Sequence, residues 1–515
     1  MPRVEEAGSR KACARKPYGR NRIAGWPPSA YVSKVMSVIH AVHAAPVAPS
    51  VLDALREAVG PRGWVDDPGA IAAHLSEERG RFHGTCAAVV RPGTTEEVAA
   101  VVAICAGAGL PVVPQGGNTG LVGGGVPDGG VVVSLARLNR IRAVDPLNRT
   151  ITIEAGVILS ELQDAAREAG AMFPLSLGAE GSCRIGGNLA TNAGGITVVR
   201  YGNARDMVLG LEVVLPDGRV WDGLKGLRKN NTGYDLKHLF VGSEGTLGII
   251  TAAVLKLFPK PRGEETALVA LPSVEAALEL FQRCNAAAGD VLTAFEFFSR
   301  RCLDFCLAHV AGVGDPFADA HPAYALIKLS SPREGEALRD ALEGVLADAM
   351  EAEVVSDAVL AMSEAQADQL WRIRESIPEA QKGEGGSIKN DVSVPLSQVP
   401  AFIARAGAAV EAAMPGIRVV AFGHFGDGNI HFNLSQPVGA DRSAFLAEWD
   451  RFDRIVADVA ADLDGSFSAE HGVGRLKCAD MLRYKSPVEL DLMRKIKRAL
   501  DPQNIMNPGK VVPLD

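Results

Sequence analysis

The chain has 515 residues, of which 47% are hydrophobic and 22% charged. This composition is typical of a folded protein of about three domains and excludes wholesale disorder. Its 53 basic and 61 acidic residues leave a net charge of −8, which disfavours nucleic acid and anionic lipid as partners. No apolar run reaches the roughly 18 residues of a membrane span. Eight cysteines without a CxxC pair are too few for a disulfide framework in a chain of this length, so we expect a soluble protein of a reducing compartment.

The N-terminal stretch differs from the remainder. Residues 7–52 contain no Asp or Glu but seven Lys and Arg, and we expect an N-terminal extension over 1–45 that lies outside the fold and is disordered. The favoured interpretation is a tail or a misplaced start before Met36, with a cytoplasmic protein. The alternative is an organellar transit peptide over 1–35, with the mitochondrial matrix as destination.

Glycine and proline, together with alternating and amphipathic runs, set the bounds of the next elements. In chain order we expect two short helices within 49–76, a Thr-capped helix within 91–110, strands at 111–115 and 131–135, a strand at 150–156, a helix at 158–170 and a hairpin that turns at 216–218. A strand, not a helix, follows the glycine-rich loop after residue 115. This order differs from a Rossmann unit and disfavours NAD bound in that way.

Prolines and charges interrupt the pattern at 258–266, which predicts a domain boundary. Longer helices then alternate with strands: helices over 274–289, 333–350 and 361–381, and strands over 293–300 and 324–330. This alternation predicts an α+β domain whose sheet is covered by helices on one face.

Four glycine clusters lie in the first half, at 115–125, 180–195, 230–235 and 242–248. Glycine lets backbone N–H groups approach an anion without a Cβ atom in the way, so such loops can bind a pyrophosphate. Turns alone explain most single glycine pairs. Four clusters with interleaved Asn, Thr and Ser favour a bound ligand, and the absence of a GxxxxGK[ST] motif disfavours a Walker-type site.

The motifs PQGGNTGLVGG, GGNLATNAGG and VGSEGTLGIIT resemble those of the vanillyl-alcohol-oxidase-type flavoproteins, and within them the D-2-hydroxyacid dehydrogenase branch. The resemblance extends from about residue 84 to the C-terminal NIMNPGKVVP. It implies an α+β protein with a two-subdomain FAD-binding domain over 46–262, a substrate- and metal-binding cap domain over 263–470, and a C-terminal segment, 471–515, that returns to the flavin.

The resemblance also implies the cofactor site. Its residues would be Gly116, Gly117, Asn118, Thr119, Gly120 and Ser134 at the pyrophosphate, Gly181, Ser182, Gly187, Asn188, Thr191 and Asn192 at the isoalloxazine and ribityl chain, Glu244 and Ile249 at the adenine side, and Asn507 of the C-terminal motif. Some relatives bind FAD covalently through a His directly after the first glycine pair. Asn118 occupies that position here, so we expect noncovalent FAD.

The segment VVAFGHFGDGNIHFNL predicts a hairpin. A two-residue type I′ turn at Asp427-Gly428 would place His424 directly opposite His431, with Cβ atoms about 5 Å apart, and Asn433 on the same face. Two imidazoles at this distance can share a divalent ion such as Zn²⁺, although a lone buried His is more often structural.

A metal site needs a third ligand, and SAEHGVGR is the only other comparably rich segment. There Glu470 can supply a carboxylate oxygen while His471 stays free for acid–base chemistry. The resemblance implies the same assignment, with His424, His431 and Glu470 as ligands and His471 as the base.

Substrate anchors for a hydroxy acid must be cationic, and the segment 371–391 offers four candidates, Arg372, Arg374, Lys382 and Lys389. The resemblance selects Arg374 and Lys389 as carboxylate binders, with Asn433 as a further substrate contact. Some hydroxyglutarate-oxidising relatives carry a hydroxyl residue four positions after the arginine, where this chain has Pro378.

The resemblance therefore implies FAD-dependent, metal-assisted oxidation of a D-2-hydroxy acid, in which His471 takes the hydroxyl proton and flavin N5 takes the hydride. The first expectation is D-2-hydroxyglutarate, followed by D-lactate or glycolate. Reduced flavin would pass its electrons to an acceptor such as an electron-transfer flavoprotein, a quinone or a cytochrome, and a homodimer is possible. The alternatives are a non-redox transferase of the alkyl-glycerone-phosphate synthase branch and a noncatalytic flavin- or metal-binding protein.

Overall fold

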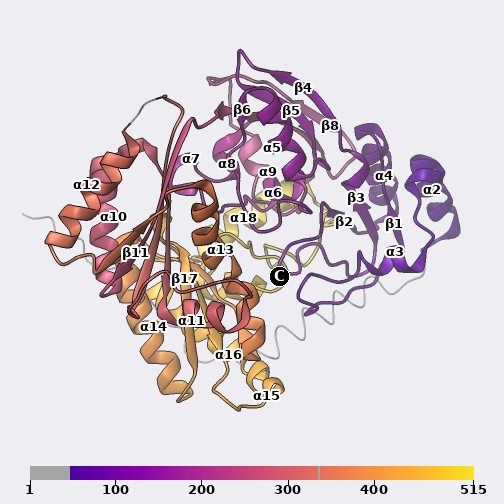
Figure 1. The fold of residues 1–515 in the computed structure, drawn as a ribbon. Helices are drawn as coiled ribbons and strands as arrows, with labels where there is room; N and C mark the ends of the chain where they lie inside the picture. Colours follow the sequence, from indigo (N-terminus) through magenta and orange to yellow (C-terminus); the bar gives the residue numbers. More distant parts are fainter. Residues whose placement is uncertain (1–46, 335–336, 515) are drawn as a thin grey trace, which may run out of the picture. The chain divides into compact units, whose positions relative to one another are not determined.

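The computed structural model describes residues 47–334 and 337–514 (Figure 1). The N-terminal extension expected over 1–45 lies outside the described residues. Three sheets of three or more strands and one two-stranded sheet organise the described chain, and the helices and strands together confirm the α+β class.

The first sheet is small and parallel. Its strand order is β1-β3-β2, with β1 at Ala88–Val90, β2 at Val112–Gln115 and β3 at Val131–Ser134, and helices α2 (Pro49–Gly63), α3 (Pro68–Ala72) and α4 (Thr95–Ala108) belong to the same region. Thr94 caps α4, and Gly109 ends it in the left-handed conformation, as predicted from the sequence. The glycine-rich loop connects β2 to β3, and this connection positions it at the edge of the sheet.

The second sheet is antiparallel, with the order β4-β5-β9-β7-β8. Its strands are β4 (Ile141–Asp145), β5 (Thr150–Glu154), β7 (Val208–Val214), β8 (Val220–Gly223) and β9 (Ile249–Lys256). Helices α5 (Leu159–Glu168), α6 (Ile185–Ala190), α7 (Val198–Tyr201), α8 (Ala204–Met207) and α9 (Lys237–Phe240) lie between these strands in the chain, and β6 (Ala171–Met172) pairs with β10 (Phe258–Pro259).

The third sheet is antiparallel, eight-stranded and the largest, with the order β14-β11-β13-β12-β17-β18-β15 and β16 paired to β18. Its strands are β11 (Gly263–Leu271), β12 (Leu292–Ser299), β13 (Ala323–Ser331), β14 (Asp357–Leu360), β15 (Ser387–Ile388), β16 (Asp391–Ser393), β17 (Arg418–His424) and β18 (Asn429–Ser435). Its helices are α10 (Val274–Ala288), α11 (Arg300–His309), α12 (Leu338–Glu351), α13 (Glu364–Ala380), α14 (Val399–Ala413), α15 (Arg442–Ala447) and α16 (Trp449–Asp462).

Helices cover both faces of this sheet, so the prediction of one covered face was wrong. Ala267 and Val269 of β11 pack with α10, α12, α14 and α16, whereas Leu268 and Ala270 pack with α11 and α13. The strands signal this burial by near-continuous apolar runs in place of alternation, which is the pattern of a sheet buried on both faces.

The C-terminal region packs against the first sheet. After α17 (Cys478–Tyr484) and α18 (Pro487–Leu500), the chain passes alongside β2, where Val112 donates to the Ile505 carbonyl and Asn507 donates to the Val112 carbonyl. Ile505 and Met506 are buried in the core of that sheet. The buried Lys497 ammonium secures this return by donating to the carbonyls of Thr246 and Met506 and to the Asp501 carboxylate.

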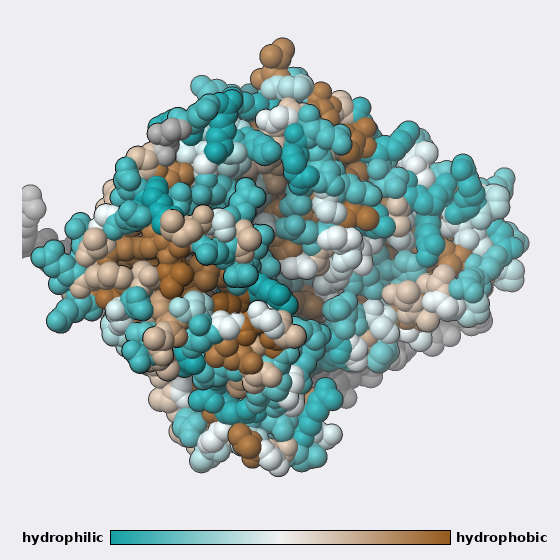
Figure 2. Space-filling model, in the orientation of Figure 1, coloured by the Kyte–Doolittle hydropathy of each residue, from teal (hydrophilic) through white to brown (hydrophobic). Residues whose placement is uncertain are grey.

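Hydrophilic and apolar residues are interspersed on the face of the molecule in Figure 2, and the largest apolar area there lies over the region of α10 and β11. None of the helices within residues 47–334 and 337–514 has the length and hydropathy that crossing a membrane requires.

Candidate active site

The glycine-rich loops enclose a cavity of about 540 Å³. Three segments form most of its wall: the β2–β3 loop, the chain around α6, and the loop that leads into β9. The predicted cofactor residues that line it are Gly116, Gly117, Asn118, Thr119, Gly120, Ser182, Gly187, Asn188, Thr191, Glu244 and Ile249. Sequence reasoning missed several other lining residues, among them Glu78, Cys183 and Arg184.

Four predicted cofactor residues lie just outside the lining. Ser134 ends β3 beside Gln115, and Gly181 precedes the lining residue Ser182. The Asn192 side chain accepts a hydrogen bond from the backbone of Arg205. Asn507 donates to the carbonyls of Gly124 and Glu244, both of which belong to the lining, so it supports the wall.

The cavity wall is largely bare backbone, as a dinucleotide site requires. A Cβ atom at Gly117 would lie 2.3 Å from the Ser182 carbonyl oxygen, so two of the loops meet backbone to backbone. A Cβ at Gly120 or Gly187 would project into open space. The Oδ1 atom of Asn188 is buried without a partner among the described residues. Such an unpaired acceptor and glycine surface fit an extended polar ligand such as FAD.

The predicted histidine hairpin forms, but with a different register. Phe422, not His424, lies opposite His431, because the turn is longer than two residues and includes a 3₁₀ turn at Phe425–Asp427. Phe425 is fully buried there, with its ring 5.9 Å from Phe295 and 5.7 Å from Phe297, so the turn follows the packing of this side chain. The prediction of a two-residue turn was therefore wrong.

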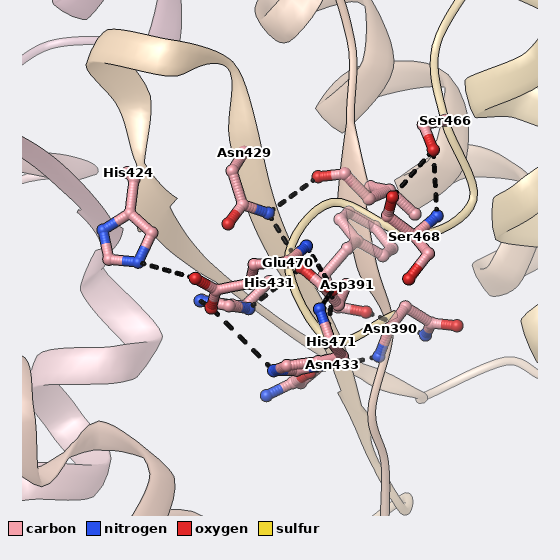
Figure 3. Close-up of polar contacts among 12 residues, drawn as sticks. Asn390, Asp391, His424, Asn429, His431, Asn433, Ser466, Ser468, Glu470 and His471 are labelled. Carbon is pink, nitrogen blue, oxygen red and sulfur yellow. Dashed lines mark hydrogen bonds and ion pairs between the residues drawn. The ribbon is translucent and has the colours of Figure 1, made fainter. Parts of the chain in front are cut away.

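The observed register differs from the predicted one by two residues, which leaves each side chain on the same face of the sheet. His424 and His431 therefore still lie close together, as predicted. The ring centroids of His424 and His431 are 5.6 Å apart. The Nε2 atoms of His424 and His431 lie 3.9 Å and 3.6 Å from the two carboxylate oxygens of Glu470. Figure 3 shows this convergence.

Asp391 is a member of the cluster that sequence reasoning missed. Asp391, His431, Glu470 and His471 each offer one atom within 4.8 Å of the others, a grouping able to hold a metal ion. The Asp391 carboxylate accepts hydrogen bonds from the backbone N–H groups of Glu470 (3.0 Å) and His471 (2.9 Å), and from the Asn429 side chain (2.9 Å).

Opposing effects set the charges in this cluster. Burial alone would raise the pKa of Asp391, but His471, Lys477 and His431 hold it well below its usual range. Burial lowers the pKa of His471 to about 4, so its imidazole is neutral near pH 7 and free to accept a proton. Burial likewise raises the pKa of Glu470 to about 7.

Glu296 is the second missed residue, and it links two predicted site residues. Its buried carboxylate contacts His424 Nδ1 at 2.7 Å on one side and Arg374 at 2.8 Å (Nε) and 2.7 Å (Nη2) on the other. Burial opposes a charged imidazole at His424, but Glu296 raises the pKa of His424 to about 9. The sequence signal was a lone acid in an apolar strand, TAFEFF, since a buried charge requires a partner.

Of the four candidate substrate cations, two contact other predicted or newly found site residues and two do not. Arg374 is buried against Glu296 and over the Phe422 ring, and Lys389 donates to the Gln381 amide oxygen, which also accepts from Asn433. Arg372 instead bonds to the Ala311 carbonyl, and Lys382 pairs with Glu379 at the surface.

Two family models match the chain. Residues 260–511 match FAD linked oxidases, C-terminal domain, and residues 86–223 match FAD binding domain. The chain is 44% identical to D-2-hydroxyglutarate dehydrogenase of Xanthomonas citri pv. viticola, over 82% of this chain and 89% of that protein. It is 40% identical to the mitochondrial D-2-hydroxyglutarate dehydrogenase of Bos taurus, over 89% of this chain and 82% of that protein.

Solved structures resemble the fold at lower identity. An alkyldihydroxyacetonephosphate synthase superposes with a TM-score of 0.70 at 20% identity, over 90% of this chain and 85% of that chain. p-Cresol methylhydroxylase with substrate bound superposes with a TM-score of 0.72 at 19% identity, over 90% and 96%. The fold and the glycine-lined cavity are thus those of the vanillyl-alcohol-oxidase-type flavoproteins. Within this class, the chain belongs to the FAD-dependent D-2-hydroxyacid dehydrogenases, oxidoreductases that act on CH–OH donors.

The Glu296 bridge predicts a specific pH dependence of stability in metal-free protein. The pKa of His424 in the folded state, about 9, exceeds its ordinary value of 6.5, so the bridge stabilises the fold fully below pH 6.5 and loses this contribution as pH rises through 9. Glu296→Gln should lower the free energy of unfolding by up to roughly 3 kcal/mol below pH 6.5. Between pH 6.5 and 9 the stability of this variant should fall less than that of the wild type. Chemical denaturation at several pH values measures this.

A matched control is Glu384→Gln, because Glu384 bridges His309 and Arg418 in the same way outside the cluster. It should keep the wild-type loss of stability between pH 6.5 and 9. If the free energy of unfolding depends on pH equally in wild type and in Glu296→Gln, the bridge does not hold His424 protonated.

Proposed function

We propose that this protein oxidises D-2-hydroxyglutarate to 2-oxoglutarate with noncovalent FAD and a divalent metal ion, most simply Zn²⁺. The single observation that carries the proposal is the cluster of His424, His431 and Glu470, with His471 beside it, at a glycine-lined cavity that Glu470 and His471 also line. The names of the 44% and 40% identical relatives support this substrate over D-lactate and glycolate.

The residues fit both cofactors. Two imidazole nitrogens and a carboxylate oxygen are the donor set of many catalytic zinc sites, and Glu296 on His424 Nδ1 is a typical supporting carboxylate. When bound, FAD supplies the two-electron acceptor for the Cα hydride. When bound, a divalent ion supplies a Lewis acid that favours ionisation of the substrate hydroxyl.

The protein's own residues handle the proton and the carboxylate. Neutral His471 accepts the hydroxyl proton, and the adjacent Asp391 carboxylate, 3.4 Å from His471 Nδ1, stabilises the resulting imidazolium. Lys389 and Arg374 bind the substrate carboxylate, and Asn433 donates a further hydrogen bond to the substrate. The Glu296 contact fixes the direction of the Arg374 guanidinium.

The transferase alternative rests on fold alone, since the alkyldihydroxyacetonephosphate synthase is 20% identical. The histidine–carboxylate cluster and the relatives of higher identity favour the dehydrogenase.

Anaerobic flavin bleaching tests the function directly. D-2-hydroxyglutarate should bleach the flavin, the L-enantiomer should not, and D-lactate and glycolate should react more slowly because they lack the second carboxylate. Chelation should abolish bleaching without loss of flavin. A flavin that no D-2-hydroxy acid reduces would contradict the proposal, and full activity after metal removal would contradict the metal.

The cofactor linkage has its own test. Because Asn118 follows Gly116-Gly117 where a linking His would stand, the protein should be yellow and should release intact FAD into the supernatant on acid precipitation. Yellow colour that stays with the precipitate would show a covalent bond.

His471 and Glu470 are adjacent but should differ in effect. Loss of a general base costs about 10²- to 10⁴-fold. His471→Ala should therefore lower kcat by about this factor with metal content unchanged, and its residual rate should rise with pH as hydroxide replaces the base. Glu470→Ala should lower both kcat and metal content. Equal metal loss in the two variants would make His471 a ligand.

A further inference from the structure

One residue, Lys477, closes the loop at 467–473, which carries the proposed metal ligand and the proposed base. Its backbone N–H donates to the Val473 carbonyl at 3.0 Å, and its Nζ ammonium donates to the Phe467 carbonyl at 2.7 Å. These two acceptors are the last and the first residue of the loop. Lys477 therefore fixes the two ends of the loop relative to each other.

The same ammonium also contacts the strand that holds the middle of the loop. It lies 3.4 Å from the backbone carbonyl of Asp391 in β16, and the Asp391 carboxylate accepts the N–H groups of Glu470 and His471 (Figure 3). Burial would raise the pKa of Asp391, but the charges of His471 and Lys477 lower it, so this carboxylate stays an anion. Lys477 thus supports the loop at its ends and at its centre.

The backbone of this loop depends on such contacts, because it has no regular secondary structure. Residues 467–473 contain no helix or strand, and Gly472 and Gly474 adopt positive φ angles of 84° and 49°. Glycine loses more backbone freedom on folding than any other residue, so ordering this segment is costly. Within the loop, the Ser468 hydroxyl donates to the Gly472 carbonyl at 2.6 Å. The remaining order must come from hydrogen bonds such as those of Lys477.

Burial shows that the charge of Lys477 matters at this position. The residue is only 6% exposed, and its ammonium donates to backbone carbonyls. Removing an ammonium from water is costly, so an apolar side chain would serve better if the position only filled space. Lys477 is not among the residues that line the cofactor cavity, so any effect on the chemistry passes through the loop.

We propose that Lys477 is a positioning residue, whose ammonium holds the loop so that His471 can take the substrate proton. The inference rests on the proposed function and adds a residue to which none of its steps assigns a role. The competing explanation is a buried lysine that stabilises the fold and has no effect on the base. A displacement of about 1 Å at a catalytic group can cost about 10²-fold in rate, so the two roles predict different kinetics.

The test measures the rate of anaerobic flavin reduction by D-2-hydroxyglutarate at saturating Zn²⁺. Lys477→Met keeps most of the side-chain volume but removes the ammonium donors. It should lower the limiting rate by roughly 10- to 100-fold. The substrate concentration that gives half of this rate should change little, because Lys389 and Arg374 remain. An unchanged limiting rate would overturn the proposal. If the Met variant does not fold, Lys477→Gln, whose amide can still donate to one carbonyl, should show a smaller loss of the same kind.

A double-mutant cycle separates positioning from stability. If Lys477 acts through His471, Lys477→Met should lower the rate much less in a His471→Ala background than in wild type, because the base is already missing there. Equal losses in the two backgrounds would show that Lys477 acts independently of His471, and the proposal would be wrong.

The matched control is Arg339→Met. Arg339 also donates to a backbone carbonyl, that of Ala361 at 2.9 Å, but it attaches α12 to β11, which two strands separate from β17. This variant should lower the free energy of unfolding while the limiting rate stays that of wild type. A rate that falls equally in the two variants at equal loss of stability would reduce the effect of Lys477 to stability alone and refute its positioning role.

Amide hydrogen exchange tests Lys477 without turnover. The amides of Glu470 and His471 should exchange faster in Lys477→Met than in wild type, and in Arg339→Met they should not. A protein that behaves in this way but whose flavin no D-2-hydroxy acid reduces would support the hold of Lys477 on the loop and refute the proposed function. Unchanged exchange in Lys477→Met would overturn the role of Lys477, whatever the protein oxidises.

Discussion

Two buried carboxylates hold the backbone of the loop that carries His471. Asp391, from the largest sheet, accepts the N–H groups of Glu470 and His471, and Glu244, from the cofactor cavity, accepts those of Val473 and Gly474. Adjacent residues of an extended chain face opposite sides, so Glu470 and His471 could not share a site without this constraint. The positive φ of Gly472, 84°, makes the bend between the two pairs of N–H groups possible.

Charge pairing explains much of the remaining geometry. A charge removed from water needs a partner, and the buried Glu296 of the largest sheet has two, His424 and Arg374. This pairing aims the Nε2 atom of His424 at Glu470 and fixes the guanidinium of Arg374. Lys389, in contrast, donates to the uncharged amide oxygen of Gln381.

The features that depend only on residues close together in the chain could be predicted from the sequence. The Thr cap and Gly stop of α4, the glycine loops, and the His and Glu residues of the two motifs needed no knowledge of the fold. The hairpin register failed because Phe425 packs against Phe295 and Phe297, a contact between distant segments. Asp391 and Glu296 were missed for the same reason, since their roles depend on pairing with β18 and β17 across the sheet. A lone acid in an apolar strand was the available signal for Glu296.

The oxidation of a hydroxy acid removes a proton from oxygen and a hydride from the neighbouring carbon, so the base and the flavin cavity must lie within one substrate of each other. Here His471 and most of the cavity wall come from segments far apart in the chain, so no single element could set their positions. The loop with His471 solves this problem because Asp391 attaches it to the histidine cluster while Glu244 attaches it to the cavity wall. Asn507 reinforces the second attachment by donating to the Glu244 carbonyl, so the C-terminal return also contributes to the position of His471.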